Sequence, residues 1–154
     1  MSYFNIAQQG HIVNVMGAYD IDSGAGSCDA FSMENWSHAS IIISFGVAGG
    51  TVAVTLSEST TAAAGTDIAF KYAKEITTLG DTMGALTQAT STGITTTASA
   101  NSFYVIEIDA ADLSAGYNWV QLALAEATGS TLCSAIAVLS GGRYSGDESA
   151  TAIA

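Results

Sequence analysis

Apolar and polar residues alternate along most of this chain, a pattern typical of β-strands that bury one face. Val52, Val54 and Leu56 alternate with small or polar residues, so this strand is predicted to be half buried. Residues 102–108 alternate in the same way. The run 39–45 is apolar almost throughout, which predicts a central strand buried on both faces.

The same reasoning extends over the whole chain. The predicted strands are 11–16, 39–45, 51–57, 68–72, 94–97, 102–108, 118–125 and 132–139. Gly49-Gly50 predicts a hairpin before the third strand, and Thr128-Gly129-Ser130 predicts another between the last two. No clear pattern covers 79–89, and 109–116 is predicted to be a turn. About eight strands without a long amphipathic helix predict an all-β fold, an antiparallel β-sandwich of jelly-roll type or a small barrel.

Length and composition predict one domain with a neutral surface. The 154 residues suffice for a single core, which we place in a β-sandwich domain at 11–145, between an N-terminal arm at 1–10 and a C-terminal tail at 146–154. Both ends are expected to become ordered only on assembly. Charged residues make up only 11% of the chain, against about 25% in typical domains. A surface poor in charge packs readily against copies of itself, because few charged side chains have to be desolvated.

The charge balance limits the possible partners. Fourteen acidic residues against Lys71, Lys74 and Arg143 give a formal net charge of −11. Nucleic acids and anionic membranes both require clustered cations, so neither is an expected partner. The N-terminal sequence MSYFNIAQQG lacks the basic start and apolar run of a signal peptide. We therefore expect the chain to be made and used in a cytoplasm, or in a particle assembled there.

Few residues suggest chemistry. His11 and His38 lie in no catalytic motif and are interpreted as structural, while Glu107 is expected to point outward to solvent or to a subunit partner. No nucleophile, base and orienting group can be assembled, so the sequence predicts no enzyme and no catalytic residue. The glycine pairs lack a Walker lysine, so no cofactor-binding residue is predicted either.

An acidic segment and a pair of cysteines each allow two interpretations. The spacing of Asp20, Asp22 and Asp29 is similar to the start of a calcium-binding loop, but Phe31 occupies the twelfth position, where such a loop has a bidentate glutamate. A solvated Asx turn is favoured there, and no metal site is predicted. Cys28 and Cys133 could form one disulfide; without a secretion signal, free thiols are favoured.

Four segments together have a familiar pattern. They are WSHASIII at 36–43, TVAVTL at 51–56, SFYVIEIDAADL at 102–113 and VLSGGRY at 138–144. With these segments the chain resembles small virion proteins of tailed bacteriophages, called head decoration, cement or minor capsid proteins. The resemblance implies a jelly-roll-like protein, assembled in the host cytoplasm, that coats the capsid exterior in many copies and bridges neighbouring shell subunits. Its partners would be the major capsid protein and copies of itself, as a homodimer or homotrimer.

The resemblance supplies no interface residues, so those are chosen by residue type. Tyr3, Phe4, Arg143 and Tyr144 lie near the chain ends, and aromatic residues and arginine are favoured anchors of interfaces. We therefore predict that these four residues contribute to binding.

Two other classes remain open. A tail-tube or head-completion protein would be a different virion component, and would form rings. A cellular carbohydrate-binding or adhesion module would use Trp36, Tyr117 and Trp119 as a sugar-stacking platform, although core packing is the favoured interpretation of Trp119.

Overall fold

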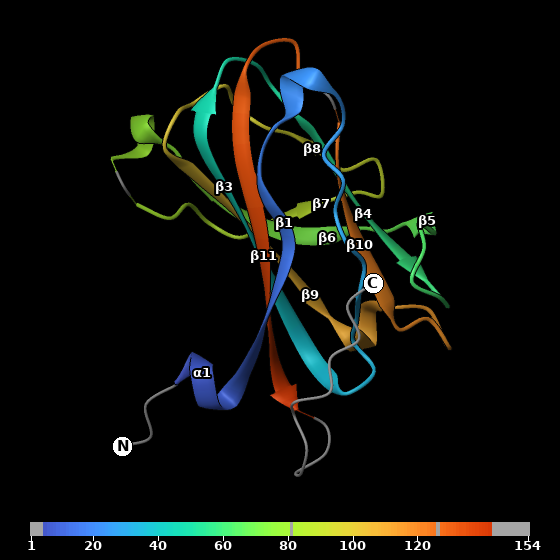
Figure 1. Ribbon diagram of the computed structural model, residues 1–154. Helices are drawn as coiled ribbons and strands as arrows, with labels where there is room; N and C mark the ends of the chain where they lie inside the picture. The colour runs from blue at the N-terminus through green and yellow to red at the C-terminus, as the bar shows by residue number, and fades with distance from the viewer. Residues whose placement is uncertain (1–4, 81, 126, 143–154) are drawn as a thin grey trace.

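The computed structural model describes residues 5–80, 82–125 and 127–142, and shows two antiparallel β-sheets packed face to face (Figure 1). The larger sheet has the strand order β1 (Gly10–Asp20), β11 (Thr131–Gly142), β3 (Trp36–Ala48), β9 (Ser102–Asp109), β6 (Phe70–Glu75), β7 (Thr87–Ala89). The smaller has the order β2 (Phe31–Ser32), β10 (Trp119–Leu124), β4 (Ala53–Ser59), β5 (Thr66–Asp67), and β8 (Ile94–Thr95) also pairs with β4. This arrangement confirms the predicted all-β sandwich.

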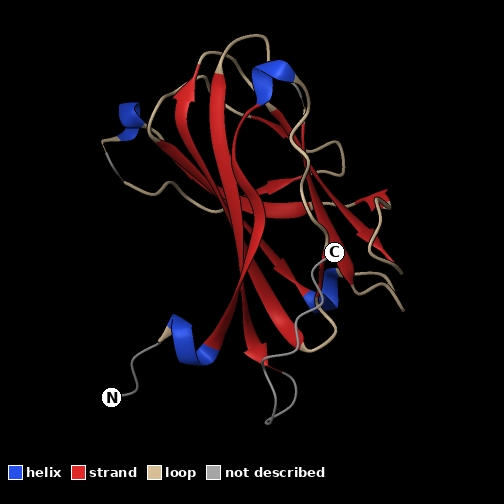
Figure 2. Cartoon of the chain, viewed as in Figure 1, coloured by secondary structure: helices blue, strands red, loops and turns tan. Residues whose placement is uncertain are grey.

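Helical structure is confined to short pieces in the described ranges (Figure 2). The helix α1 (Ile6–Gln9) precedes β1, and Asn5 caps it by accepting a hydrogen bond from the Ala7 N–H. The 3-10 turns are η1 (Ile21–Ser23), η2 (Thr77–Leu79) and η3 (Ala110–Asp112), and η3 lies in the predicted turn 109–116. No helix in this part of the chain is long and apolar enough to cross a membrane.

The described ranges contain eleven strands, where the sequence predicts about eight. The eight predicted segments correspond to β1, β3, β4, β6, β8, β9, β10 and β11. The additional strands β2, β5 and β7 have only two or three residues each, too few for an alternating pattern to be recognised. Of the predicted N-terminal arm, residues 5–10 form α1 and the start of β1, whereas the predicted tail lies outside the described residues.

The two predicted hairpins are wrong, because both turns carry the chain from one sheet to the other. β3 pairs with β11 and β9, while β4 pairs with β10 in the opposite sheet. The two crossing turns pack against each other: the Gly49 N–H donates to the Ser130 carbonyl at 2.8 Å. A Cβ on Gly49 would lie 2.7 Å from that oxygen, so glycine is needed for close packing of two loops and not for a hairpin.

The core lies between the two sheets, so each strand of the larger sheet turns only one face toward it. Along β3, Ala39, Ile41, Ile43 and Phe45 are buried, while the side chains between them are only half buried. The prediction that this strand is buried on both faces is therefore wrong. β3 is interior to its sheet, but no strand or helix in residues 5–80, 82–125 and 127–142 forms a second layer over its outer face. The half-buried prediction for β4 is confirmed as far as Leu56, because Val54 and Leu56 are fully buried and Ala53 is exposed, whereas Ser57, expected to face outward, is buried too.

Candidate functional site

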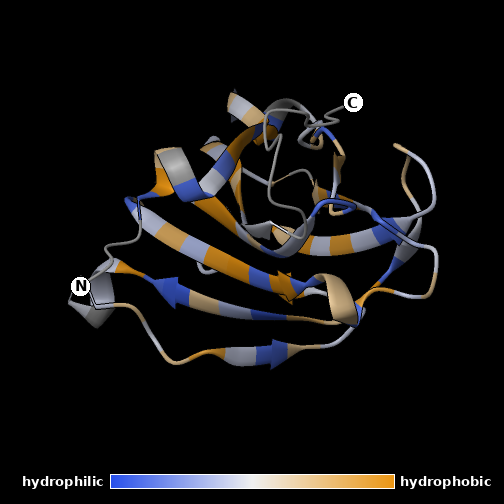
Figure 3. Ribbon diagram, turned by 90° about the horizontal axis from the view of Figure 1, so that it is seen from below, coloured by the Kyte–Doolittle hydropathy of each residue, from blue (hydrophilic) through white to orange (hydrophobic). Residues whose placement is uncertain are grey.

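The outer face of the larger sheet carries several apolar side chains among its polar ones. Cross-strand pairing places Ile136, Ile42 and Val105 side by side on β11, β3 and β9. We define the apolar band as these three residues with Ile12, Val138, Phe103 and Leu132. Figure 3 shows how apolar and polar positions alternate along the strands.

Several members of the apolar band are open to solvent. Ile12 is 50% exposed, Leu132 44%, Phe103 40% and Ile136 37%. Single exposed apolar residues are normal on soluble proteins, but a contiguous apolar patch usually marks an interaction surface. The apolar band extends over β1, β11, β3 and β9, so it is a candidate binding surface.

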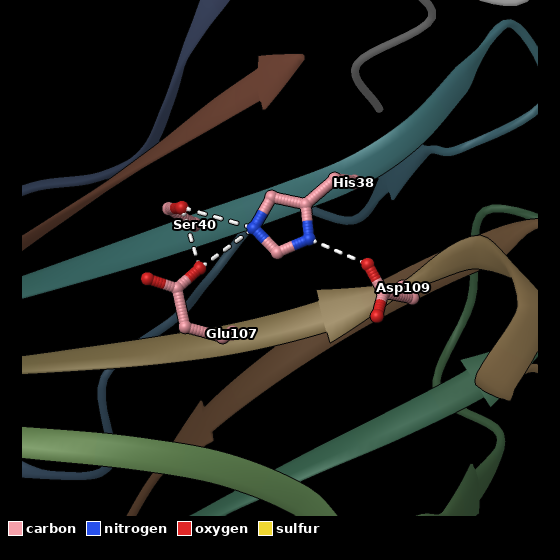
Figure 4. A network of polar contacts seen from close by, with 4 residues as sticks. All are labelled: His38, Ser40, Glu107 and Asp109. Atoms are coloured by element: carbon pink, nitrogen blue, oxygen red, sulfur yellow. Dashed lines mark hydrogen bonds and ion pairs between the residues drawn. The ribbon is translucent and has the colours of Figure 1, made fainter. Parts of the chain in front are cut away.

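A polar network lies at one end of the apolar band (Figure 4). The His38 imidazole lies between two carboxylates: Nδ1 is 2.7 Å from Asp109 Oδ1, and Nε2 is 2.8 Å from Glu107 Oε2. The Ser40 hydroxyl donates to the same Glu107 oxygen at 2.6 Å. Strand register produces this arrangement, because His38 is paired with Asp109 and Ser40 with Glu107 across β3 and β9. We call these four residues the His38 network.

The two carboxylates favour the charged form of the histidine. Burial of the ring opposes ionisation, but hydrogen bonds to Asp109 and Glu107, together with their charges, outweigh it and raise the pKa of His38. An imidazolium can donate from both nitrogens at once, which suits one carboxylate on each side. The network therefore favours the protonated form of His38 and links β3 to β9 on the outer face.

Neither hydrolysis nor metal binding suits this geometry. Ser40 Oγ lies 3.3 Å from His38 Nε2, but its hydroxyl donates to Glu107. The same Glu107 carboxylate is also hydrogen-bonded to His38 Nε2. β3 and β9 are both interior strands, so their backbone N–H groups are committed to sheet pairing and do not form an oxyanion hole. The carboxylates bind opposite sides of the ring, and the described residues contain no group of three possible ligands that could hold a metal ion.

The predicted Asx turn is confirmed at Asp20. Its carboxylate accepts hydrogen bonds from the Ser130 hydroxyl at 2.7 Å, the Thr131 N–H at 2.8 Å and the Asp22 N–H at 3.2 Å. These bonds, with that of Ser130 the largest contribution, lower the pKa of Asp20. The carboxylate thus ties the end of β1 to the start of β11, which is a structural role.

The cysteines are free and buried, as favoured from the sequence. The Cys28 sulfur lies 3.8 Å from the Met16 sulfur. Burial raises the pKa of Cys28 to about 12 and that of Cys133 to about 11. Both side chains are therefore thiols near neutral pH and act as small core residues.

A separate cavity of about 350 Å³ is bordered by Glu58, Asp67, Lys71 and Asp112. Glu58 is only 5% exposed, but both of its carboxylate oxygens accept hydrogen bonds from Ser114, one from the N–H and one from the hydroxyl. Because this buried carboxylate already has partners within the protein, it anchors the segment after η3 to β4.

The aromatic residues considered for sugar binding do not form a platform. Trp36 is buried in the core, with its ring centre 6.0 Å from that of His11. Trp119 is partly buried and Tyr117 is 36% exposed. Only part of the proposed stacking surface is therefore accessible.

The four predicted interface residues, Tyr3, Phe4, Arg143 and Tyr144, lie outside the described residues. The His38 network was not predicted, because its hydrogen bonds join residues of β3 to residues of β9 that lie 67 to 71 positions further along the chain. One signal could have indicated it: the pairs His38-x-Ser40 and Glu107-x-Asp109 each place two polar side chains on one face of an otherwise apolar strand.

Comparison with known protein families, with curated proteins and with solved structures found no match. The functional argument therefore depends on the chain itself, above all on its outer sheet face.

Proposed function

We propose that this chain is a structural protein of a tailed-bacteriophage virion, which binds the outside of the capsid and stabilises the shell by bridging neighbouring subunits. The apolar band carries this proposal. The core between the sheets is already closed by buried side chains, so the apolar band can be covered only by something other than the core. A protein whose role is to bind other molecules in many copies needs such a surface.

The strand order supports a jelly-roll fold. Leaving out β6, β7 and β8, eight strands remain, and numbering them along the chain gives the orders 1-8-3-6 and 2-7-4-5 in the two sheets. These orders match those of a jelly roll, in which successive strands alternate between the sheets except for the fourth and fifth, and so they support that proposal. The three omitted strands are an insertion between the fifth and sixth. Jelly rolls are common in viral capsid proteins and also in lectins.

The size of the outer face is adequate for such an interface. Six strands spaced ~4.8 Å apart, with ~6 residues each at ~3.4 Å per residue, give a face of roughly 600 Å². A standard interface buries about 800 Å² on each partner. One chain would thus bind a shell subunit with moderate affinity. Self-association as a dimer or trimer would add avidity on a repetitive shell.

The proposal includes no enzymatic activity, cofactor, nucleic-acid partner or membrane partner. The geometry of the His38 network argues against hydrolysis, and the net charge of −11 disfavours contact with a genome. The protein would be assembled with the particle in the host cytoplasm and remain on its outer surface.

The first test is size-exclusion chromatography with light scattering. The purified chain would be measured alone and after mixing with capsids of the phage that encodes it, with the decoration removed. Dimers or trimers that then bind capsids in stoichiometric numbers are the expected result. Rings or open polymers would favour the tail-tube or head-completion alternative. A monomer that ignores capsids would contradict the proposal, and a glycan array would then test the binding-module alternative.

A further inference from the structure

We infer that the outer face docks on a protein surface with apolar side chains at its centre and an arginine or lysine facing Glu107 and Asp109, and not on a second copy of this chain. The inference depends on the proposed function and adds the chemistry of the partner. It follows from the geometry of the His38 network and from the distribution of charge.

Each carboxylate of the His38 network has one oxygen with no hydrogen-bond donor among the described residues. Glu107 binds His38 and Ser40 through Oε2, and Asp109 binds His38 through Oδ1. Within the described part of the chain, Glu107 Oε1 and Asp109 Oδ2 accept no hydrogen bond, and Figure 4 shows both directed away from the imidazole. The residues are two apart on one strand, so their Cα atoms lie roughly 7 Å apart on one face. One long cationic side chain can reach this position.

The local charge also favours a cation. With two carboxylates around one imidazole, the His38 network carries a net negative charge whether the ring is neutral or protonated. Lys71 is paired with Glu107 in the strand register, but its ammonium forms no ion pair among the described residues. An incoming guanidinium would therefore add a charge-assisted bond without displacing an existing one.

A second copy of this chain complements the face poorly. A two-fold dimer brings the same patch of both subunits together. Among the described residues, the outer face of β3, β9 and β6 carries Glu75, Glu107 and Asp109 with His38 and Lys71, and the whole chain carries −11. Back-to-back packing would thus bring together two faces on which carboxylates outnumber cations, in two chains of −11 each, and like-charge repulsion disfavours this. Any homo-oligomer should therefore use another surface.

The test uses a defined probe, a synthetic peptide of alternating leucine and arginine, titrated into the isotope-labelled full chain and followed by NMR. We expect shifts at outer-face positions of β3, β9 and β11. The double variant Glu107→Gln with Asp109→Asn should weaken binding about tenfold, the change expected when charged contacts at an interface are lost. Asp67→Asn, on β5 of the other sheet, is the matched control and should bind as the parent does. Melting curves would confirm that all variants are folded.

Shifts located elsewhere, or equal affinity of the double variant and the parent, would overturn the inference. So would sedimentation showing a dimer that Ile136→Ser dissociates, because a second copy would then occupy the face. Capsid binding separates the two proposals. If the parent binds capsids and the double variant binds equally well, the inference fails while the proposed function stands. If the peptide maps to the face but capsids are not bound, the function fails while the inference stands.

Discussion

Two neighbouring isoleucines on β3 provide the most direct test of how the sandwich is built. Ile43 points into the core and is 0% exposed, while Ile42 points outward into the apolar band and is half buried. The substitutions Ile43→Ala and Ile42→Ala remove the same atoms from the same strand. Any loss of β-propensity is therefore similar in the two variants, and the difference between them reports burial.

The expected magnitudes differ clearly. Alanine removes three carbon atoms, worth ~2.4 kcal/mol at ~0.8 kcal/mol for each buried group. At Ile43 the cavity left behind adds to this, so the free energy of unfolding should fall by about 2–5 kcal/mol. At Ile42 the space opens to solvent and only about half the side chain is buried, so the loss should be about 1 kcal/mol. The two variants should thus differ by at least ~1 kcal/mol, or about 2–4 °C in melting temperature.

Urea unfolding at 25 °C, followed by tryptophan fluorescence, measures both losses. The experiment should be repeated at several protein concentrations, because an oligomer that covers the outer face would make the cost at Ile42 concentration-dependent. Equal losses for the two variants at every concentration would refute the argument that only one face of β3 is buried within the chain.

Three further predictions concern single side chains. Because the pKa of His38 is raised in the folded protein, the stabilisation from its charge is fully present below the ordinary histidine pKa near 6.5 and is lost as pH rises through the higher folded pKa. Unfolding at a series of pH values should show this loss of stability, and His38→Asn should abolish it. Thr96→Val should cost about 1–3 kcal/mol, because the buried Val52 N–H loses its hydroxyl acceptor at 2.9 Å; no change in the urea midpoint would contradict that. Cys28 and Cys133 should react with a thiol reagent only as fast as the protein opens, so rapid labelling of the native chain would show that they are accessible.

The alternation of apolar and polar residues predicts which side chains are buried wherever a single strand is long enough to show it. The alternation in β9 was predicted residue by residue, because a side-chain period of two assigns Tyr104 and Ile106 to the core and Glu107 to the outer face. The alternation in β4 was equally informative. Strands of two or three residues, such as β2 and β5, have no period to detect, and their positions depend on the neighbour with which they pair.

The glycine turns show where local reasoning ends. Gly49-Gly50 has the sequence of a hairpin, but the same residues are required when two loops pack closely, as they do against Ser130. A turn specifies that the chain reverses, and not whether the next strand joins the same sheet. That choice depends on which strands bury the most apolar surface together, and those strands are distant in the sequence.

By itself, the sequence determined that this chain is an acidic all-β protein with alternating strands and few charged residues for its length, because period, composition and charge are properties of the chain alone. The tertiary structure decided which strands are neighbours, and hence that one face of β3 lies outside the core formed by the described residues and that His38 lies between Glu107 and Asp109. The reason is that pairing across sheets is settled by the burial of residues many positions apart, a competition that no single stretch of sequence contains.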